Sequence, residues 1–362
     1  MSFPEFESGK KRLLFFVRGR GRGHAVPDLA IVDELLARRD DLDVRLVSYA
    51  TGADAIKQHG RSLIDLPLPE SGSIPEMSVI AGKLIGWLKP DLVVSHEEFA
   101  AIPAAAIFSV PSIALTDWFT GTDRYSMGSL RFAEEILFLG TEGTFPEPPW
   151  LTGKTRYVGT ILRDFRYTSA DQARARRELS IPEEATVVAV FPGSWSEERT
   201  PLADIVLQAF DALTGASKRL IWIAGADREF IASRTRGRDD VVIFDYYRDI
   251  DRLMVAANVS ITKTNRKSVF ELRHLNVPTI AVTYGLNPPD DIAVTSLKGV
   301  VRLQGNELNA EELRSHLERL IASPPERDEF PVCRVAHCGE LLSAALDRAV
   351  HSRQLPGHHA NE

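Results

Sequence analysis

Several features that define other protein classes are scarce or missing in this chain of 362 residues. It has only two cysteines, Cys333 and Cys338, which excludes a disulfide scaffold and fits a reducing compartment. His337 lies between them, but no second pair with zinc-finger spacing exists, so we expect no bound metal. The chain has no run of 18 apolar residues, and we therefore expect no membrane span.

Positive charge is also in short supply. Lys and Arg together number 43 against 50 Asp and Glu, which gives a net charge of −7. A protein that binds duplex nucleic acid needs a basic face, so we expect no nucleic-acid partner. The charge balance does not exclude small anionic ligands, because binding them requires only a few local positive groups. The first residues, MSFPEFESGKKR, lack the apolar segment of a secretory signal, and we expect a cytoplasmic protein.

What the chain does contain is a regular alternation of apolar runs and helical patterns. The first part predicts strands at 12–17, 43–49, 92–95 and 112–116, with helices at 27–39, 52–59, 77–88 and 100–108. The second part predicts strands at 186–191, 219–224, 241–244, 259–262 and 279–282, with helices at 202–213, 250–256, 268–275, 311–321 and 339–350. Strands that alternate with helices are typical of parallel sheets.

The alternation stops and restarts once, which predicts two domains. The segment 144–150 holds three prolines in seven residues and is interpreted as an exposed connector. We predict an α/β fold with two Rossmann-like, doubly wound parallel-sheet domains that face each other across a cleft. The expected bounds are 1–160 and 161–335, with a closing helix and frayed tail at 336–362. Ligands of open α/β sheets bind at the carboxyl ends of the strands.

The densest motif is the loop between the first strand and the first helix, RGRGRGHA at 18–25. Its glycines, Gly21 and Gly23 among them, allow a ligand to approach the main chain, and the free N–H groups of the following helix form an anion site. The dinucleotide fingerprint GxGxxG fits poorly, because the third glycine comes one residue early. An RNA-binding Arg-Gly segment is disfavoured too, since this loop is short and tightly framed.

His24 is the candidate catalytic residue of this loop. The positive end of the helix dipole would disfavour imidazolium and keep the ring ready to accept a proton. The alternative is a histidine that only caps the helix. The sequence His-Glu-Glu at 96–98 follows the strand 92–95 and would either help to orient His24, position an acceptor, or form a solvated loop.

With these motifs, the chain resembles the GT-B glycosyltransferases, and within them the group that contains the N-acetylglucosaminyltransferase of peptidoglycan synthesis. The turn Gly-x-Gly-x-Gly-His-Ala carries the first part of the resemblance. Residues 191–194 (FPGS) resemble the family's diphosphate loop, 244–254 its base-binding segment, and 261–280 its donor strand, loop and helix. Residues 158–163 resemble its Val-Gly-x-Pro-x-Arg segment, with Ile161 in place of the proline. The likeness spans roughly residues 12–330.

The resemblance implies that the first domain faces the acceptor and the second binds a nucleotide sugar, with UDP as the expected nucleotide. It implies direct displacement with inversion, His24 as the base, Glu271 at the ribose hydroxyls, and neither a metal nor a cofactor. It also implies that the closing helix packs on the first domain. The expected nucleotide-sugar contacts are Gly21, Gly23, Arg163, Gly193, Ser194, Phe244, Ser268, Glu271, Asp290 and Asp291. A surface role for Glu271 and a salt bridge for Arg163 are the alternatives.

Some positions depart from the family. The loop 264–267, Thr-Asn-Arg-Lys, is bulky and basic where the family has small residues, and Asp290 and Asp291 match only loosely. These departures leave the donor sugar open. They leave the acceptor unidentified as well, with a lipid and a glycan as the candidates. The apolar helix 77–88 is either a membrane-surface contact or a buried crossover helix. The alternative functions are a UDP-sugar 2-epimerase and an inactive protein that binds a sugar nucleotide.

Overall fold

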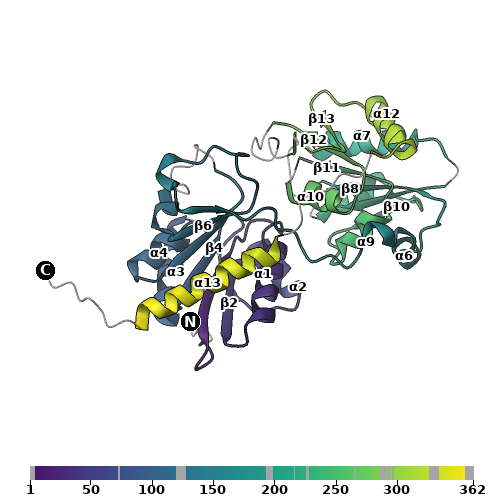
Figure 1. Ribbon diagram of the computed structural model, residues 1–362. Helices are drawn as coiled ribbons and strands as arrows, with labels where there is room; N and C mark the ends of the chain where they lie inside the picture. The colour runs from purple at the N-terminus through teal and green to yellow at the C-terminus, as the bar shows by residue number, and fades with distance from the viewer. Residues whose placement is uncertain are drawn as a thin grey trace. The chain divides into compact units, whose positions relative to one another are not determined.

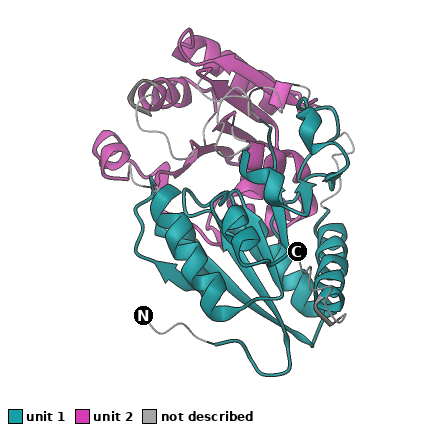
Figure 2. Ribbon diagram, turned by 90° about the vertical axis from the view of Figure 1, so that its left-hand side faces the viewer, with its two compact units in different colours: residues 1–164, 332–362 teal, residues 165–331 magenta. Residues whose placement is uncertain are grey.

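The computed structural model describes residues 5–71, 74–119, 128–192, 199–215, 217–225, 228–264, 266–285, 291, 294–295, 297–325 and 334–354. The chain divides into two compact units (Figure 2). Unit 1 consists of residues 1–164 and 332–362, and unit 2 consists of residues 165–331. The final helix therefore belongs to the unit that the N-terminal part of the chain forms. Each unit is described by itself.

Unit 1 is built on a parallel sheet with the strand order β3-β2-β1-β4-β5-β6-β7 (Figure 1). Its strands are β1 (Lys11–Val17), β2 (Leu42–Tyr49), β3 (Ile64–Leu66), β4 (Leu92–His96), β5 (Ser112–Thr116), β6 (Glu135–Phe138) and β7 (Thr155–Tyr157). Its helices are α1 (Ala25–Arg38), α2 (Ala50–Gln58), α3 (Ile74–Leu88), α4 (Ala101–Ile107) and α13 (Val335–Gln354), with short 3₁₀ turns at Leu130–Phe132 and Pro149–Leu151.

The strands of unit 1 are apolar on both faces because helices cover both sides of the sheet. Leu13, Phe15 and Val17 of β1 pack with α1, α2 and α13. The alternate residues Leu14 and Phe16 pack with α3 and α4 on the opposite face. The predicted helix at 339–350 is α13, and its apolar residues lie in the same cluster as those of α1.

Unit 2 repeats this architecture with the strand order β10-β9-β8-β11-β12-β13, again parallel. Its strands are β8 (Thr186–Phe191), β9 (Lys218–Ile223), β10 (Val241–Phe244), β11 (Val259–Lys263), β12 (Thr279–Thr283) and β13 (Val300–Gln304). Its helices are α6 (Gln172–Glu178), α7 (Arg199–Asp211), α8 (Arg228–Arg234), α9 (Ile250–Ala256), α10 (Arg266–His274) and α12 (Ala310–Ala322), preceded by a 3₁₀ turn at Ser169–Asp171.

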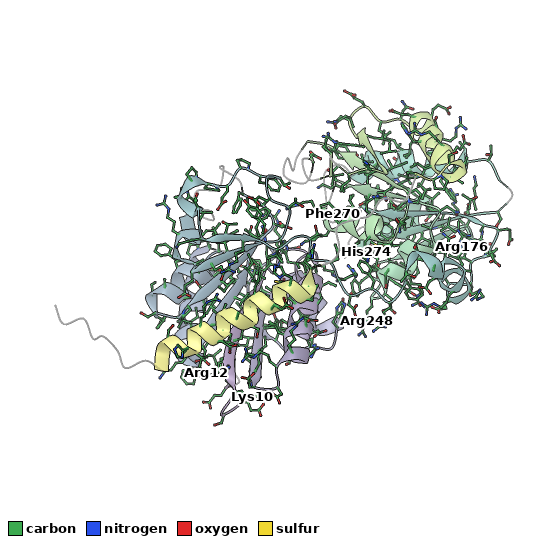
Figure 3. The ribbon with its side chains drawn as sticks, in the orientation of Figure 1. Lys10, Arg12, Arg176, Arg248, Phe270 and His274 are labelled. Carbon is green, nitrogen blue, oxygen red and sulfur yellow. The ribbon has the colours of Figure 1, made fainter. Side chains whose placement is uncertain are left out.

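A buried arginine joins two helices of unit 2. The Arg176 guanidinium on α6 donates hydrogen bonds to the carbonyl oxygens of Ala256 and Glu183 and to the side-chain oxygen of Asn258 (Figure 3). These acceptors satisfy a charged group that would otherwise be costly to bury. Arg176 therefore fixes α6 to the end of α9, and we assign it a structural role.

One sequence interpretation is wrong. The proline-rich segment 144–150 does not connect the two units, because it lies within unit 1. Most of it is exposed or half-buried as expected, but Phe145 is buried together with Leu151. Its last prolines lead into a 3₁₀ turn, where proline at the first position is pre-organised. The chain then returns to the same sheet as β7, which the sequence analysis missed because that strand has only three residues.

Candidate active site

The candidate site lies where the strand order of unit 1 changes direction. β1 and β4 are neighbours, with Val17 beside His96, while β2 and β5 lie on their outer sides. At such a switch point the loops that follow the two strands diverge and leave room for a ligand. The glycine loop with His24 follows β1, and Glu97 and Glu98 follow β4. Two segments about 70 residues apart in sequence thus meet at one edge of the sheet.

The glycine loop is packed tightly against the start of α2. A Cβ atom on Gly19 would lie 2.4 Å from the Tyr49 ring, so no larger residue fits there. Gly21 has a positive φ of 74°, which glycine adopts without strain. Its N–H donates to Thr51 Oγ1 at 2.9 Å and to Glu70 Oε1 at 3.2 Å. The Gly21 N–H is therefore engaged by protein groups, and its contact with a phosphate stays a prediction.

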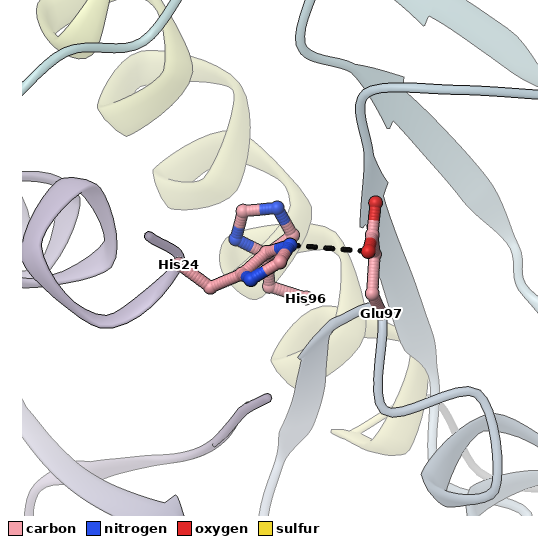
Figure 4. Close-up of side chains that lie close together, drawn as sticks. All are labelled: His24, His96 and Glu97. Atoms are coloured by element: carbon pink, nitrogen blue, oxygen red, sulfur yellow. Dashed lines mark hydrogen bonds and ion pairs between the residues drawn. The ribbon is translucent and has the colours of Figure 1, made fainter. Parts of the chain in front are cut away.

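His24 lies at the first turn of α1, and its side chain makes no capping hydrogen bond. Instead its Nε2 lies 3.1 Å from Glu97 Oε2 (Figure 4). The Glu97 side chain is 1% exposed and that of His24 is 18% exposed, so solvent can still reach the ring. The helix-capping alternative for His24 is therefore wrong. Of the alternatives for the segment 96–98, the contact with His24 is the one that the structure shows.

Arg18 completes the cluster and fixes its charge. Its Nη1 donates to the same Glu97 oxygen at 2.5 Å. Burial acts to raise the pKa of Glu97, but the interactions with His24 and with the Arg18 guanidinium outweigh it and hold that pKa well below the usual range. Glu97 is therefore ionised and can only accept hydrogen bonds.

The protonation of His24 follows from this pairing. Because ionised Glu97 accepts from Nε2, neutral His24 carries its proton on Nε2 and has its lone pair on Nδ1. Burial lowers the pKa of His24 below 6.5, although Glu97 acts to raise it. A neutral imidazole with a free Nδ1 lone pair is the form that accepts a proton near neutral pH.

The backbone of Glu97 is strained. Its φ is +56°, in the left-handed region that side chains other than glycine rarely adopt. Such conformations cost on the order of 1–3 kcal/mol and cluster at functional sites. The strain directs Glu97 toward His24 immediately after β4 ends. The solvated-loop alternative for 96–98 is wrong, since His96, Glu97 and Glu98 are all buried.

His24, His96 and Glu97 are residue types that bind metals, and their ligand atoms lie within 4.8 Å of one another. The Arg18 guanidinium, however, bonds the Glu97 oxygen that faces His24. A cation placed there would be repelled by this fixed positive charge. We therefore interpret the cluster as a hydrogen-bonded network.

Glu98 supports the glycine loop from the other side. Its Oε1 accepts from the Tyr49 hydroxyl at 2.9 Å and lies 3.4 Å from the Gly19 nitrogen. Burial raises the pKa of Glu98 to about 7. A carboxyl group that keeps its proton to neutral pH gives the loop a pH-dependent support.

Glu98→Gln should change how stability depends on pH. Between about pH 4.5 and 7, folded Glu98 keeps a proton that the unfolded chain has released, so wild-type stability should fall as pH rises through this window. Glutamine does not titrate. The stability of the variant relative to wild type should therefore rise by up to about 3 kcal/mol between about pH 4.5 and 7. Urea unfolding at pH 5, 6, 7 and 8 measures the difference. Parallel stability curves for the two proteins would contradict the prediction.

Unit 2 has its own switch point, between β8 and β11, where Phe191 lies beside Thr262. The loops after these strands hold the predicted diphosphate and donor segments. Ser268 and Glu271 lie on α10, just after β11, and Glu271 is 3% exposed. The surface alternative for Glu271 is therefore wrong. Phe244 ends β10, and its ring packs edge-on against the Tyr247 ring, with the ring centroids 4.8 Å apart.

The structure says less about the other predicted nucleotide-sugar contacts. Asp291 is buried, and its carboxylate accepts from the Thr283 hydroxyl at the end of β12. Arg163 is half-buried near the end of the first part of unit 1, and Gly23 is exposed in the glycine loop. Gly193, Ser194 and Asp290 lie outside the described residues. The roles assigned to all of these residues stay predictions.

Sequence reasoning missed one member of the cluster. Asp28 lies completely buried in the first turn of α1 and contacts His96. The signal was present, because Asp28 is the only charged residue in the apolar stretch 25–32. An acidic residue on the buried side of a helix requires a partner, and that requirement could have drawn attention to it.

Comparison with known proteins supports the class that this architecture defines. No family model matches the chain. The UDP-N-acetylglucosamine--N-acetylmuramyl-(pentapeptide) pyrophosphoryl-undecaprenol N-acetylglucosamine transferase of Bradyrhizobium diazoefficiens is 25% identical over 343 residues, covering 86% of this chain and 90% of that protein. The enzyme of the same name from an Exiguobacterium species is 23% identical over 289 residues, covering 72% of this chain and 76% of that protein.

Solved structures agree on the fold. The glycotransferase of kitacinnamycin has a TM-score of 0.62 at 18% identity and covers 96% of this chain and 100% of its own. MurG of Acinetobacter baumannii has a TM-score of 0.61 at 12% identity, and the match covers 93% of this chain and 99% of that one. The UDP-GlcNAc 2-epimerase of Methanocaldococcus jannaschii has a TM-score of 0.62 at 14% identity, and the match covers 92% of this chain and 99% of that one.

The two parallel-sheet units and these neighbours define a GT-B fold, as the sequence predicted. Within that class the chain resembles the peptidoglycan N-acetylglucosaminyltransferases, which confirms the resemblance found in its motifs. The sequence relatives are transferases, whereas the epimerases are alike in fold at 12–14% identity. The comparisons therefore support the glycosyltransferase interpretation better than the epimerase alternative.

Proposed function

We propose that this protein transfers a sugar from a UDP-sugar to an acceptor hydroxyl, with inversion at the anomeric carbon and without a metal or cofactor. The observation that carries the proposal is the His24–Glu97 pair at the switch point of unit 1, in a chain with the GT-B fold. A neutral imidazole held by an ionised carboxylate is a general base, the group that this transfer requires.

In the proposed step, His24 Nδ1 accepts the proton of the acceptor hydroxyl. The acceptor oxygen forms a bond to the anomeric carbon as the bond from that carbon to the diphosphate oxygen breaks, and the electron pair leaves with UDP. Glu97 holds the Nε2 proton and stabilises the imidazolium that forms, while Arg18 keeps Glu97 ionised. A single displacement inverts the configuration of the sugar.

The leaving diphosphate needs stabilisation as its charge grows. We assign this to the segment after β8, with Gly193 and Ser194, and to Arg163. Ser268 and Glu271 on α10 would bind the ribose side, Phe244 the base, and Asp290 with Asp291 the sugar hydroxyls. Backbone N–H groups and helix N-termini suit this task without a metal.

A turnover assay tests the function. Each of a panel of UDP-sugars is mixed with the protein, with and without a lipid-linked or glycan acceptor, and free UDP is measured. A transferase releases UDP in step with acceptor, an epimerase produces an isomeric UDP-sugar, and an inactive binding protein gives neither product. UDP at about 100 times its dissociation constant should also add about 2.7 kcal/mol of stability, which thermal unfolding detects. No stabilisation by any UDP-sugar would contradict the donor class.

Glu271→Ala should weaken UDP binding by about 1.5–3 kcal/mol, the range for hydrogen bonds to a charged group. A buried carboxylate that accepts from two ribose hydroxyls loses both bonds in the variant. Isothermal titration calorimetry measures the affinity, and Glu229→Ala on the exposed side of α8 is the matched control. Unchanged UDP affinity in Glu271→Ala would show that the ribose site lies elsewhere.

We also propose that the protein works in the cytoplasm at a membrane surface, where a lipid-linked acceptor would be presented. Among the described residues, the structure holds no helix that is both long and apolar enough to cross a bilayer. The outer side of α3 and the end of α4 nevertheless expose Trp87 (60%), Val79 (57%) and Ile107 (80%). The Phe108 ring, next to Ile107, lies against Gly86 of α3, so the end of α4 adjoins that helix.

The helix predicted at 77–88 is thus amphipathic, with an inner face in the core and an apolar outer face. Exposed lysines at 83 and 89 flank that surface and suit anionic headgroups. Ile107→Glu should lower partitioning onto vesicles that contain anionic lipid by roughly tenfold or more, given about 1.5–3 kcal/mol for one buried apolar side chain. Sedimentation with vesicles measures this, and Val242→Glu on unit 2 is the control. Equal sedimentation of both variants would contradict the proposal.

A further inference from the structure

A second pair of ionisable side chains lies next to His24, and the proposed reaction does not use it. Asp28 in the first turn of α1 and His96 at the end of β4 are both completely buried. The His96 Nδ1 atom lies 2.6 Å from Asp28 Oδ1. The pair joins α1 to the sheet directly beside the base.

Stability alone does not explain this pair. Among the described residues, Asp28 Oδ2 and His96 Nε2 have no hydrogen-bond partner. Buried polar atoms without partners destabilise a fold. Apolar residues of similar shape can often replace a buried ion pair without loss of stability. The pair therefore calls for a role other than holding α1 in place.

The position of the pair shows what that role can be. The His96 ring meets the His24 ring edge-on, with centroids 4.7 Å apart and planes at 79° (Figure 4). The Asp28 N–H also donates to the His24 carbonyl oxygen at 3.1 Å. The pair thus contacts both the ring and the backbone of the base.

We propose that His96, held by Asp28, is a positioning residue that keeps the His24 ring against Glu97 and tunes it as a base. The proposal rests on the proposed function only in treating His24 as the base. Edge-on packing restricts rotation of the His24 ring and keeps its Nε2 directed at Glu97. The positive charge that His96 can carry beside Asp28 opposes a second positive charge on His24.

The charged groups around His24 come from three elements. Arg18 follows β1, His96 and Glu97 end β4, and Asp28 lies on α1. Burial is the largest cause that lowers the pKa of His24, Glu97 raises it, and His96 and Arg18 lower it further. Of the two neighbours that lower it, His96 is the one whose ring packs edge-on against His24, so replacing His96 tests the effect.

The test is an NMR titration of the histidine rings in the full-length protein, with His24 assigned from its missing signal in His24→Gln. In His96→Gln the midpoint of His24 should rise, because the variant removes a neighbour that lowers the pKa of His24. In Asp28→Asn, which keeps shape and hydrogen bonding, the midpoint of His24 should rise by a smaller amount than in His96→Gln. His59→Gln, at the end of α2, should leave the His24 midpoint unchanged.

Circular dichroism and thermal melting establish that the variants are folded. A purely structural pair predicts a lower melting temperature with an unchanged His24 midpoint, and this result, or loss of folding in both variants, would overturn the proposal. The titration needs no substrate, so it separates this proposal from the proposed function. If transfer is found and His24→Ala abolishes it, while His96→Gln leaves the His24 midpoint in place, only the role of His96 fails.

Discussion

His24→Ala should lower turnover by roughly 10²–10⁴, the usual range for the loss of a general acid or base. The reason is that Nδ1 supplies the lone pair that takes the acceptor's proton, while Nε2 is held by Glu97. Affinity for UDP should change little, because His24 belongs to unit 1 and the expected ribose and base contacts belong to unit 2. Steady-state kinetics with the identified substrates, together with calorimetry of UDP binding, measures both quantities.

The pH profile gives an independent readout of the same base. Protonated imidazole cannot accept a proton, so kcat/KM should fall on the acid side. Because burial lowers the pKa of His24, the fall should begin below pH 6.5. Glu97→Gln should also reduce turnover, since an amide no longer selects the tautomer with the proton on Nε2. His59→Ala is the matched control. Full turnover in His24→Ala, or a rate without an acid limb, would return His24 to a structural role.

Truncation after residue 335 should abolish or severely weaken the folding of unit 1. The truncation removes nearly all of α13, whose Cys338, Leu342 and Leu346 are completely buried against α1 and the sheet. Each buried leucine contributes about 1.5–3 kcal/mol, and a whole domain is stable by only about 5–15 kcal/mol. The cut also removes Asp347, which bonds Lys11 and Arg39.

Thermal unfolding and binding of a hydrophobic dye measure this effect. A chain that ends at residue 354 keeps α13 whole and is the control. Leu342→Ala provides a milder test, because it should cost about 2–5 kcal/mol without removing the helix. An unchanged melting temperature after the cut at 335 would mean that α13 does not belong to the core.

Most of the strands and helices follow directly from the sequence, but the interior strand β6 and the edge strand β13 were not predicted. The strands at 112–116, 186–191 and 241–244 and the helix at 250–256 begin and end where they were predicted. These segments are apolar runs of strand length with turn residues at both ends, so local pattern and tertiary burial agree. The strands β3 and β7 were missed because three residues give no readable period, and their pairing depends on neighbours distant in the sequence.

The sequence by itself therefore determined two parallel α/β sheets, the glycine loop and the candidate base His24, because a pattern and a tight turn are local properties. Only the tertiary structure decided what surrounds that base. Glu97, Arg18 and the Asp28–His96 pair reach His24 from segments that are up to 79 residues apart and meet only because β1 and β4 are neighbours at the switch point. Their burial then shifts the pKa values of His24 and Glu98, an effect that depends on the loss of water around these groups and on no feature of the sequence alone.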